Sequence, residues 1–197
     1  MTTSTVNGSY PHMRVEDFDY DLPDELIAQR PAADRDGSRL MVLRRADASV
    51  EHRHFRDLPD YLAPSAALVV NNTRVMQARL HGRRDGTGGR VEVFLLRPRA
   101  GGEWEALLRP GRRMKSGVRV DVGDGALSVE VVERLQEGVF LVRLSATGEI
   151  DGAIRSVGEM PLPPYITREA DAEDLDRYQC VYAAREGAVA APTAGLH

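Results

Sequence analysis

The chain has 197 residues, of which 42% are hydrophobic and 28% charged, and its net charge is −4 at pH 7. That length suits one large domain or two small ones. The longest apolar run, Ala66 to Val70, is too short to cross a bilayer, and the single cysteine, Cys180, excludes an internal disulfide or a multi-thiolate zinc site. We therefore expect a cytoplasmic protein with no membrane partner and no metal. Residues 1–12 lack the basic start and apolar core of a secretory signal and are expected to form a disordered tail.

Residues 13–65 predict an α/β region. Prolines bracket a short helix expected over 21–31. Apolar stretches at 38–45 and 49–55 predict a strand pair, and a second short helix is expected near 58–63.

The middle of the chain, residues 66–145, predicts a small antiparallel β-barrel or sandwich. Five short segments rich in β-branched residues are separated by glycine-containing turns; they are residues 90–97, 103–109, 117–123, 126–135 and 138–144. Closure of the sheet removes exposed strand edges, so we expect a closed barrel.

Residues 146–197 return to an α/β pattern. A helix is expected over 148–158, a proline-stiffened connection over 160–166, and an acidic helix over 171–183. On that acidic helix the side chains that share one face are Leu175, Tyr178 and Tyr182. An α/β region, a β module and a second α/β region predict one domain inserted into another.

Basic residues are concentrated in the middle of the chain. From Arg79 to Arg119 there are 11 basic and 4 acidic residues, whereas the preceding and following parts carry net charges of −3 and −8. A local basic surface can neutralise phosphates whatever the net charge, so RNA is a candidate partner. The alternative is an ordinary solvated arginine-rich surface.

A polar cluster follows the apolar stretch at 66–70. Asn71, Asn72, Thr73 and Arg74 stand at the carboxyl end of this expected strand, where α/β folds bind ligands. Asparagine side chains can pair with the edge of a base, and arginine can bind a carboxylate or phosphate. The alternative is a turn in which the asparagines bond local backbone.

Three other features have competing interpretations. Tyr165 lies in the stiff segment 160–166, which either presents the ring to a ligand or simply connects two regions. The glycines at 86–89 favour a hairpin turn over a phosphate-binding loop, since no Gly-Lys-Ser/Thr follows them. His52 and His54 alternate on one expected strand without a third ligand, which favours surface residues over a metal site.

The last residues predict a tight turn that delivers His197 into a site, and they complete a set of four ordered motifs. These are DFDYDLPDELIAQRPAADRDGSRLMVL, LVVNNTRVMQARLHGR, GEMPLPPYI and YQCVYAAREGAVAAPTAGLH. On them the chain resembles the S-adenosylmethionine:tRNA ribosyltransferase-isomerases of queuosine biosynthesis, from about Met13 to His197. The resemblance implies transfer and isomerisation of the ribosyl unit of S-adenosylmethionine, a co-substrate, onto 7-aminomethyl-7-deazaguanine in tRNA. The products would be epoxyqueuosine-tRNA, adenine and methionine.

The resemblance also implies an α/β barrel with an inserted β-barrel domain. Family members continue beyond PTAGLH, so we expect an incomplete α/β barrel-like domain here, with a separate C-terminal half as a candidate partner. Met76 and Gln77 replace a bulky apolar residue and a proline that are common in the family, and Cys180 replaces the usual threonine. The alternative function is a non-catalytic tRNA-binding remnant built on the β-barrel.

The chemistry and the matching motifs give candidate roles. The C5′ protons beside a sulfonium are acidic and adenine leaves with a proton, so His197 is the candidate catalytic acid or base. The substrate-binding candidates are Asn71, Asn72, Thr73, Arg74, Tyr165, Thr193 and Gly195. The tRNA-binding candidates would bind the phosphate backbone of the tRNA and recognise its shape; they are Arg83, Arg84, Arg112, Arg113 and Lys115.

Overall fold

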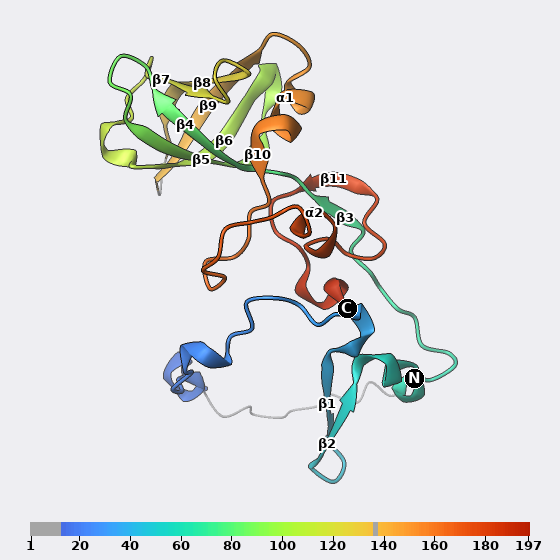
Figure 1. The fold of residues 1–197 in the computed structure, drawn as a ribbon. Coiled ribbons are helices and arrows are strands. Elements are labelled where there is room, and N and C mark those ends of the chain that lie inside the picture. Colours follow the sequence, from blue (N-terminus) through green and yellow to red (C-terminus); the bar gives the residue numbers. More distant parts are fainter. Residues whose placement is uncertain (1–12, 136–137) are drawn as a thin grey trace, which may run out of the picture.

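A computed structural model describes residues 13–135 and 138–197, so the tail predicted at 1–12 lies outside the described residues. Figure 1 shows three tiers: a β-barrel, a middle layer with helix α2 and strands β3 and β11, and a hairpin of β1 and β2. The elements below the barrel are β1 (Arg39–Arg44), β2 (Ser49–His54), β3 (Thr73–Val75), α2 (Asp174–Arg177) and β11 (Arg185–Ala188). The structure is thus mixed α/β, and the predicted hairpin is confirmed by the pairing of Arg44 with Ser49 through Arg39 with His54.

The barrel consists of six antiparallel strands. They are β4 (Arg79–Arg84), β5 (Arg90–Pro98), β6 (Glu103–Arg109), β7 (Arg119–Val122), β8 (Leu127–Arg134) and β9 (Val139–Ala146). The order is β4-β5-β6-β9-β8-β7, and a further pairing of β7 with β4 closes the sheet. Alternate residues point inward, as Val91, Val93 and Leu95 do on β5, and form one buried core. The closed barrel predicted from the sequence is therefore confirmed.

Gly82 makes the closure possible. A Cβ atom at this position would lie 2.5 Å from the carbonyl oxygen of Asp121 and 2.6 Å from a methyl group of Val120, both on β7. Only a residue without a side chain lets β4 and β7 approach so closely. The sequence prediction found the other five barrel strands but not β4, because the polar residues His81, Arg83 and Arg84 hide its alternation.

The two ends of the barrel differ. Helix α1 (Ile150–Val157) lies at one end, and its Ile154 is buried in the barrel core. The chain then forms β10 (Gly158–Glu159), which pairs with the start of β4. In an antiparallel barrel alternate loops share an end, so the loops 85–89 and 110–118, together with Leu135 and Gly138, lie at the opposite end, which we call the distal end.

Helices outside the barrel are shorter than predicted. The helix expected over 21–31 is a single 3₁₀ turn, Asp24–Leu26, and the acidic helix expected over 171–183 is reduced to α2. The helix expected over 148–158 is confirmed as α1, and that near 58–63 overlaps a 3₁₀ helix at Phe55–Tyr61. Other 3₁₀ turns of the described residues are Val15–Phe18, Arg35–Gly37, Ala100–Gly102, Gly111–Arg113 and Thr193–Leu196.

The apolar stretch at 66–70 is not a strand. It has no regular structure and its side chains are exposed, Val69 at 93%. The strand begins later, where β3 pairs in parallel with β11. The buried side chain of Gln179 extends this pairing, since its Oε1 accepts from Val75 N at 2.8 Å and its Nε2 donates to Val75 O at 2.9 Å.

Candidate functional site

A cavity of about 370 Å³ lies beside α2, where four segments distant in sequence meet. Residues 28–38 form one wall, and residues 162–168 and 174–178 form two others. Residues 193–197, which we call the C-terminal turn, form the fourth wall. Tyr165, Thr193 and His197, three of the predicted site residues, line this cavity together. A concave, mostly apolar hollow with a few polar groups is the usual form of a small-molecule site.

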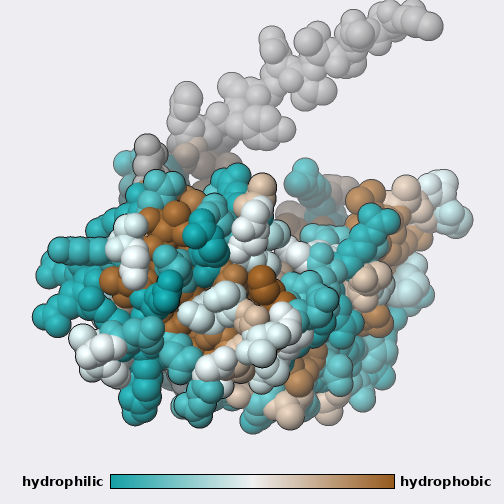
Figure 2. All heavy atoms as spheres, turned by 90° about the horizontal axis from the view of Figure 1, so that it is seen from above, coloured by the Kyte–Doolittle hydropathy of each residue, from teal (hydrophilic) through white to brown (hydrophobic). Residues whose placement is uncertain are grey.

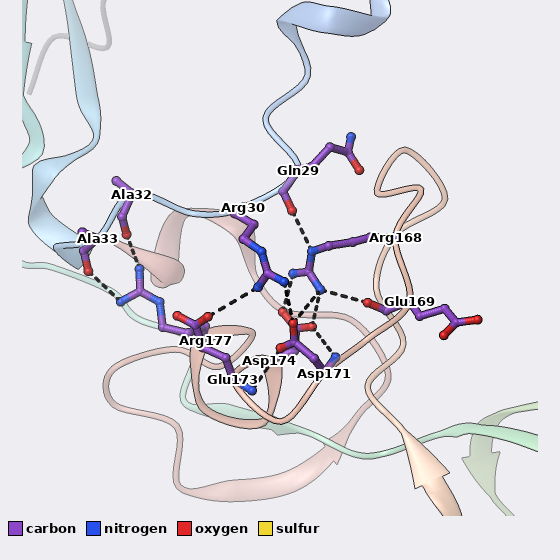
Figure 3. A network of polar contacts seen from close by, with 10 residues as sticks. All are labelled: Gln29, Arg30, Ala32, Ala33, Arg168, Glu169, Asp171, Glu173, Asp174 and Arg177. Atoms are coloured by element: carbon purple, nitrogen blue, oxygen red, sulfur yellow. Dashed lines mark hydrogen bonds and ion pairs between the residues drawn. The ribbon is translucent and has the colours of Figure 1, made fainter.

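A buried ion pair joins the walls formed by residues 162–168 and 174–178 (Figure 3). Both carboxylate oxygens of Asp174, which is 3% exposed, accept from Arg168 at 2.6 and 2.7 Å. Asp171 N donates to the same carboxylate at 2.9 Å. The hydrogen bonds from Arg168 hold the pKa of Asp174 below its ordinary value, and the contact in turn raises the pKa of Arg168.

Hydrogen bonds and ion pairs also attach the wall at residues 29–33. Arg30 binds Asp171 at 2.7 Å and Glu173 at 3.4 Å, while Arg177 donates to the carbonyl oxygens of residues 32 and 33. Gln29 accepts from Thr167 N at 2.7 Å, and its carbonyl oxygen accepts from Arg168. The arginines around this cavity are thus occupied with protein acceptors.

The cavity is therefore better suited to an uncharged ring than to a phosphate. Its walls include Leu162, Ile166 and the rings of Tyr165 and Tyr178. Burial raises the pKa of the Tyr178 hydroxyl, which accordingly stays neutral at physiological pH. Aromatic side chains of this kind bind planar heterocycles by stacking.

His197 occupies a defined place at the cavity edge. Its Nδ1 lies 2.8 Å from Ser38 Oγ, and its ring centroid lies 5.3 Å from that of Phe55. Gly195 is buried behind it, where a Cβ atom would lie 2.5 Å from Cys180 Sγ. The role of Gly195 in this structure is to let the turn approach Cys180.

The other predicted substrate-binding residues lie elsewhere. Asn71 Oδ1 accepts from Thr73 N at 3.0 Å, and the carbonyl oxygen of Asn72 accepts from Ala184 N at 2.8 Å. The Asn71 contact matches the turn interpretation, whereas the Asn72 contact is a backbone bond to a segment distant in sequence. Asn71, Asn72 and Thr73 line neither the cavity nor the second hollow described next.

A second hollow of about 630 Å³ lies between the barrel and the middle layer. Arg74 lines it together with Trp104 and Met160, and Arg155 pairs across it with Glu186 at 3.5 Å. Helix α2 stands between the two hollows: Asp174, Arg177 and Tyr178 face the cavity, whereas Leu175, Asp176 and Gln179 face the second hollow.

The predicted tRNA-binding residues gather at the distal end of the barrel. Arg83 and Arg84 end β4, and Arg112, Arg113 and Lys115 belong to the loop at 110–118. None of the five forms an ion pair with another residue of the described ranges 13–135 and 138–197. Seen from the barrel side, the surface is mostly hydrophilic (Figure 2). Arg83 also stands directly opposite Arg90 on β5, a pairing of like charges.

Sequence reasoning missed several cavity residues. The missed residues are Arg35, Ser38 and Arg168. Their contacts join positions 161, 159 and 6 residues apart, so the local spacing of residues does not indicate most of these contacts. Gln179 lies inside the last of the four motifs, but nothing in that motif indicates that its amide pairs with a strand.

Two further observations concern metals and membranes. Among the residues that the structure describes, no group of three His, Cys, Asp or Glu side chains is placed to hold a metal ion. No helix in residues 13–135 and 138–197 has the length and apolar character of a membrane span.

Comparison with known proteins identifies relatives. The chain is 51% identical over 185 residues to an S-adenosylmethionine:tRNA ribosyltransferase-isomerase from Halothermothrix orenii and 49% identical to one from Staphylococcus haemolyticus. Each alignment covers 94% of this chain and 54% of the relative, so the chain spans about half the length of the curated relatives it matches. A crystal structure of S-adenosylmethionine tRNA ribosyltransferase from Thermotoga maritima aligns at 34% identity with a TM-score of 0.37, covering 86% of this chain and 55% of that one. A family model described as queuosine biosynthesis protein matches residues 15–197, so the chain belongs to the queuosine biosynthesis protein family.

Proposed function

We propose that this chain takes part in transferring and isomerising the ribosyl unit of S-adenosylmethionine onto 7-aminomethyl-7-deazaguanine in tRNA, which yields epoxyqueuosine-tRNA, adenine and methionine. The observation that carries the proposal is the match to ribosyltransferase-isomerases at about half identity along 94% of the chain. The cavity beside α2 supports it, because its apolar side chains and tyrosine rings suit the adenosyl part of S-adenosylmethionine, while the arginines in its walls are bound to protein acceptors.

Within this proposal His197 exchanges a proton with the substrate. Its side chain lines the cavity, and an imidazole can both take and give a proton near neutral pH. Tyr165 would stack on a ring, and Thr193 would contact a hydroxyl group. Asn71, Asn72, Thr73 and Arg74, of which only Arg74 lines a hollow, would act on the base or the methionine carboxylate.

The test is release of adenine from S-adenosylmethionine in the presence of tRNA that carries the precursor base. His197→Ala should abolish release, whereas His52→Ala, an exposed histidine on β2, should leave it unchanged. Full activity of His197→Ala would remove this residue from the mechanism.

The distal end of the barrel is the proposed tRNA-binding surface. Its arginines and lysine have no acidic partner among the described residues, so they remain able to neutralise phosphates. A quadruple change of Arg83, Arg84, Arg112 and Arg113 to Gln should weaken tRNA binding. It should also flatten the salt dependence of binding, by about 0.7 to 0.9 in slope for each phosphate that is no longer neutralised. Unchanged affinity would refute this surface.

The same observation supports a second candidate, a non-catalytic tRNA-binding module built on the barrel. It predicts salt-sensitive tRNA binding without adenine release, and the two assays together separate the candidates.

We also propose that activity needs a polypeptide equivalent to the remainder of the relatives' length, with which the α/β part would complete a barrel. Exposed apolar side chains outside the β-barrel support this proposal; they are Met41, Leu43, Val50, Leu68 and Val69.

A further inference from the structure

The imidazole of His197 is held by residues from the opposite end of the chain. Ser38 Oγ lies 2.8 Å from Nδ1, and the Phe55 ring packs on the imidazole with an interplanar angle of 38°. Phe55 N donates to the carbonyl oxygen of Ser38 at 2.8 Å, so the two contacting residues are themselves tied together. This arrangement fixes which edge of the imidazole faces the protein.

Arg35 fixes the backbone beside the same ring. Its guanidinium donates to the carbonyl oxygens of Leu196 at 3.3 Å and Gln179 at 2.7 Å, and also to that of Asp176. The C-terminal turn and the end of α2 are therefore attached to one side chain, three positions before Ser38.

We propose that Ser38 is a positioning residue for His197, holding Nδ1 so that Nε2 is the nitrogen available to a ligand in the cavity. Both side chains line that cavity, and within the described ranges no other protein group hydrogen-bonds the imidazole. The catalytic meaning of this contact rests on the proposed function, whereas the contact itself does not.

A hydroxyl suits this task because it both donates and accepts. Ser38 can donate to Nδ1 when that atom carries a lone pair, and it can accept from Nδ1–H when the ring is protonated or has the other tautomer. The ring can thus gain or lose a proton at Nε2 while Nδ1 keeps its partner. A carboxylate in the same place would hold the proton on Nδ1 and favour the charged ring instead.

The first test measures the ring without any substrate. Nitrogen-15 NMR of histidine-labelled protein, with the His197 signals assigned by their loss in His197→Gln, reports the hydrogen bonding of each ring nitrogen. Ser38→Ala should shift the Nδ1 signal, because that atom loses its hydrogen-bond partner. Ser38→Thr, which keeps the hydroxyl, should retain the wild-type signals, as should Ser156→Ala on α1, whose hydroxyl bonds only Ala153 O among described residues. Unchanged signals in Ser38→Ala would overturn the inference.

The second test measures adenine release in the system used for the proposed function. Ser38→Ala should lower kcat about 10- to 100-fold with little change in KM and should displace the pH profile, because a misplaced proton-transfer group loses rate more than binding. Ser38→Thr should restore most of the rate. Altered NMR signals combined with full activity of His197→Ala would uphold the positioning contact and reject the proposed role of His197, so the two failures are distinguishable.

Discussion

Replacing Asp174 with Asn tests whether the buried ion pair holds the cavity walls. The substitution keeps the shape of the side chain but leaves Arg168, whose side chain is only 20% exposed, facing a neutral amide. Removing one partner of a buried ion pair lowers the free energy of unfolding by about 3–5 kcal/mol. Arg168 keeps the carbonyl oxygens of Gln29 and Glu169 as acceptors, so we expect a loss at the lower end of this range, about 3 kcal/mol.

The assay must follow the cavity walls as well as the barrel. Trp104, the only tryptophan, belongs to the barrel core, so its fluorescence during urea unfolding reports the barrel, while hydrogen exchange of residues 165–179 reports the walls. The control is Glu173→Gln, which removes an exposed partner of Arg30 and should cost under about 1 kcal/mol. If Asp174→Asn changes wall protection no more than Glu173→Gln does, the ion pair does not hold the walls.

Three further outcomes are expected. Because the folded-state pKa of Asp174 lies below its unfolded value of about 3.9, its stabilising contribution is complete above that value and is lost as pH falls toward the folded pKa; Asp174→Asn should therefore flatten the acid limb of a stability-against-pH curve. Arg90→Gln should raise the free energy of unfolding of the barrel by about 0.2–1 kcal/mol at low salt, because it removes one charge of a cross-strand like-charge pair, and it should weaken tRNA binding. Arg143→Gln, which removes the exposed partner of Glu103, is the control and should have neither effect. Gln179→Ala should cost about 2 kcal/mol in urea unfolding, because it leaves both backbone groups of one β3 residue unpaired; a wild-type midpoint would contradict this.

The barrel could be predicted from the sequence because each strand carries its own signal. Alternation such as Val91, Val93, Leu95 encodes which face is buried, and glycine-containing turns mark the strand ends. The exception is β4, where charged residues occupy the outward positions and Gly82 occupies an inward one. Its identity as a strand depends on a close approach to β7 that no local pattern reports.

The cavity could be predicted only in part, since most of its contacts join distant segments. The motifs indicated Tyr165, Thr193 and His197 as site residues, and these meet in one cavity. Helix patterns failed at 21–31 and 171–183, where polar side chains bond partners more than 100 positions away, such as Gln29 with Thr167 and Gln179 with Val75. Tertiary contacts of this kind override the weak helix propensity of a short segment.

The position of α2 between the two hollows has a thermodynamic consequence. The residues of this one-turn helix face both hollows, Asp174 and Arg177 the first and Leu175 and Asp176 the second, so a ligand that displaces the helix from one hollow reshapes the other. If occupancy of the first hollow changes the affinity of the second by some factor, occupancy of the second changes the first by the same factor. Two ligands that each displace α2 would therefore be energetically linked without touching, and the order in which they bind could not alter the size of that linkage.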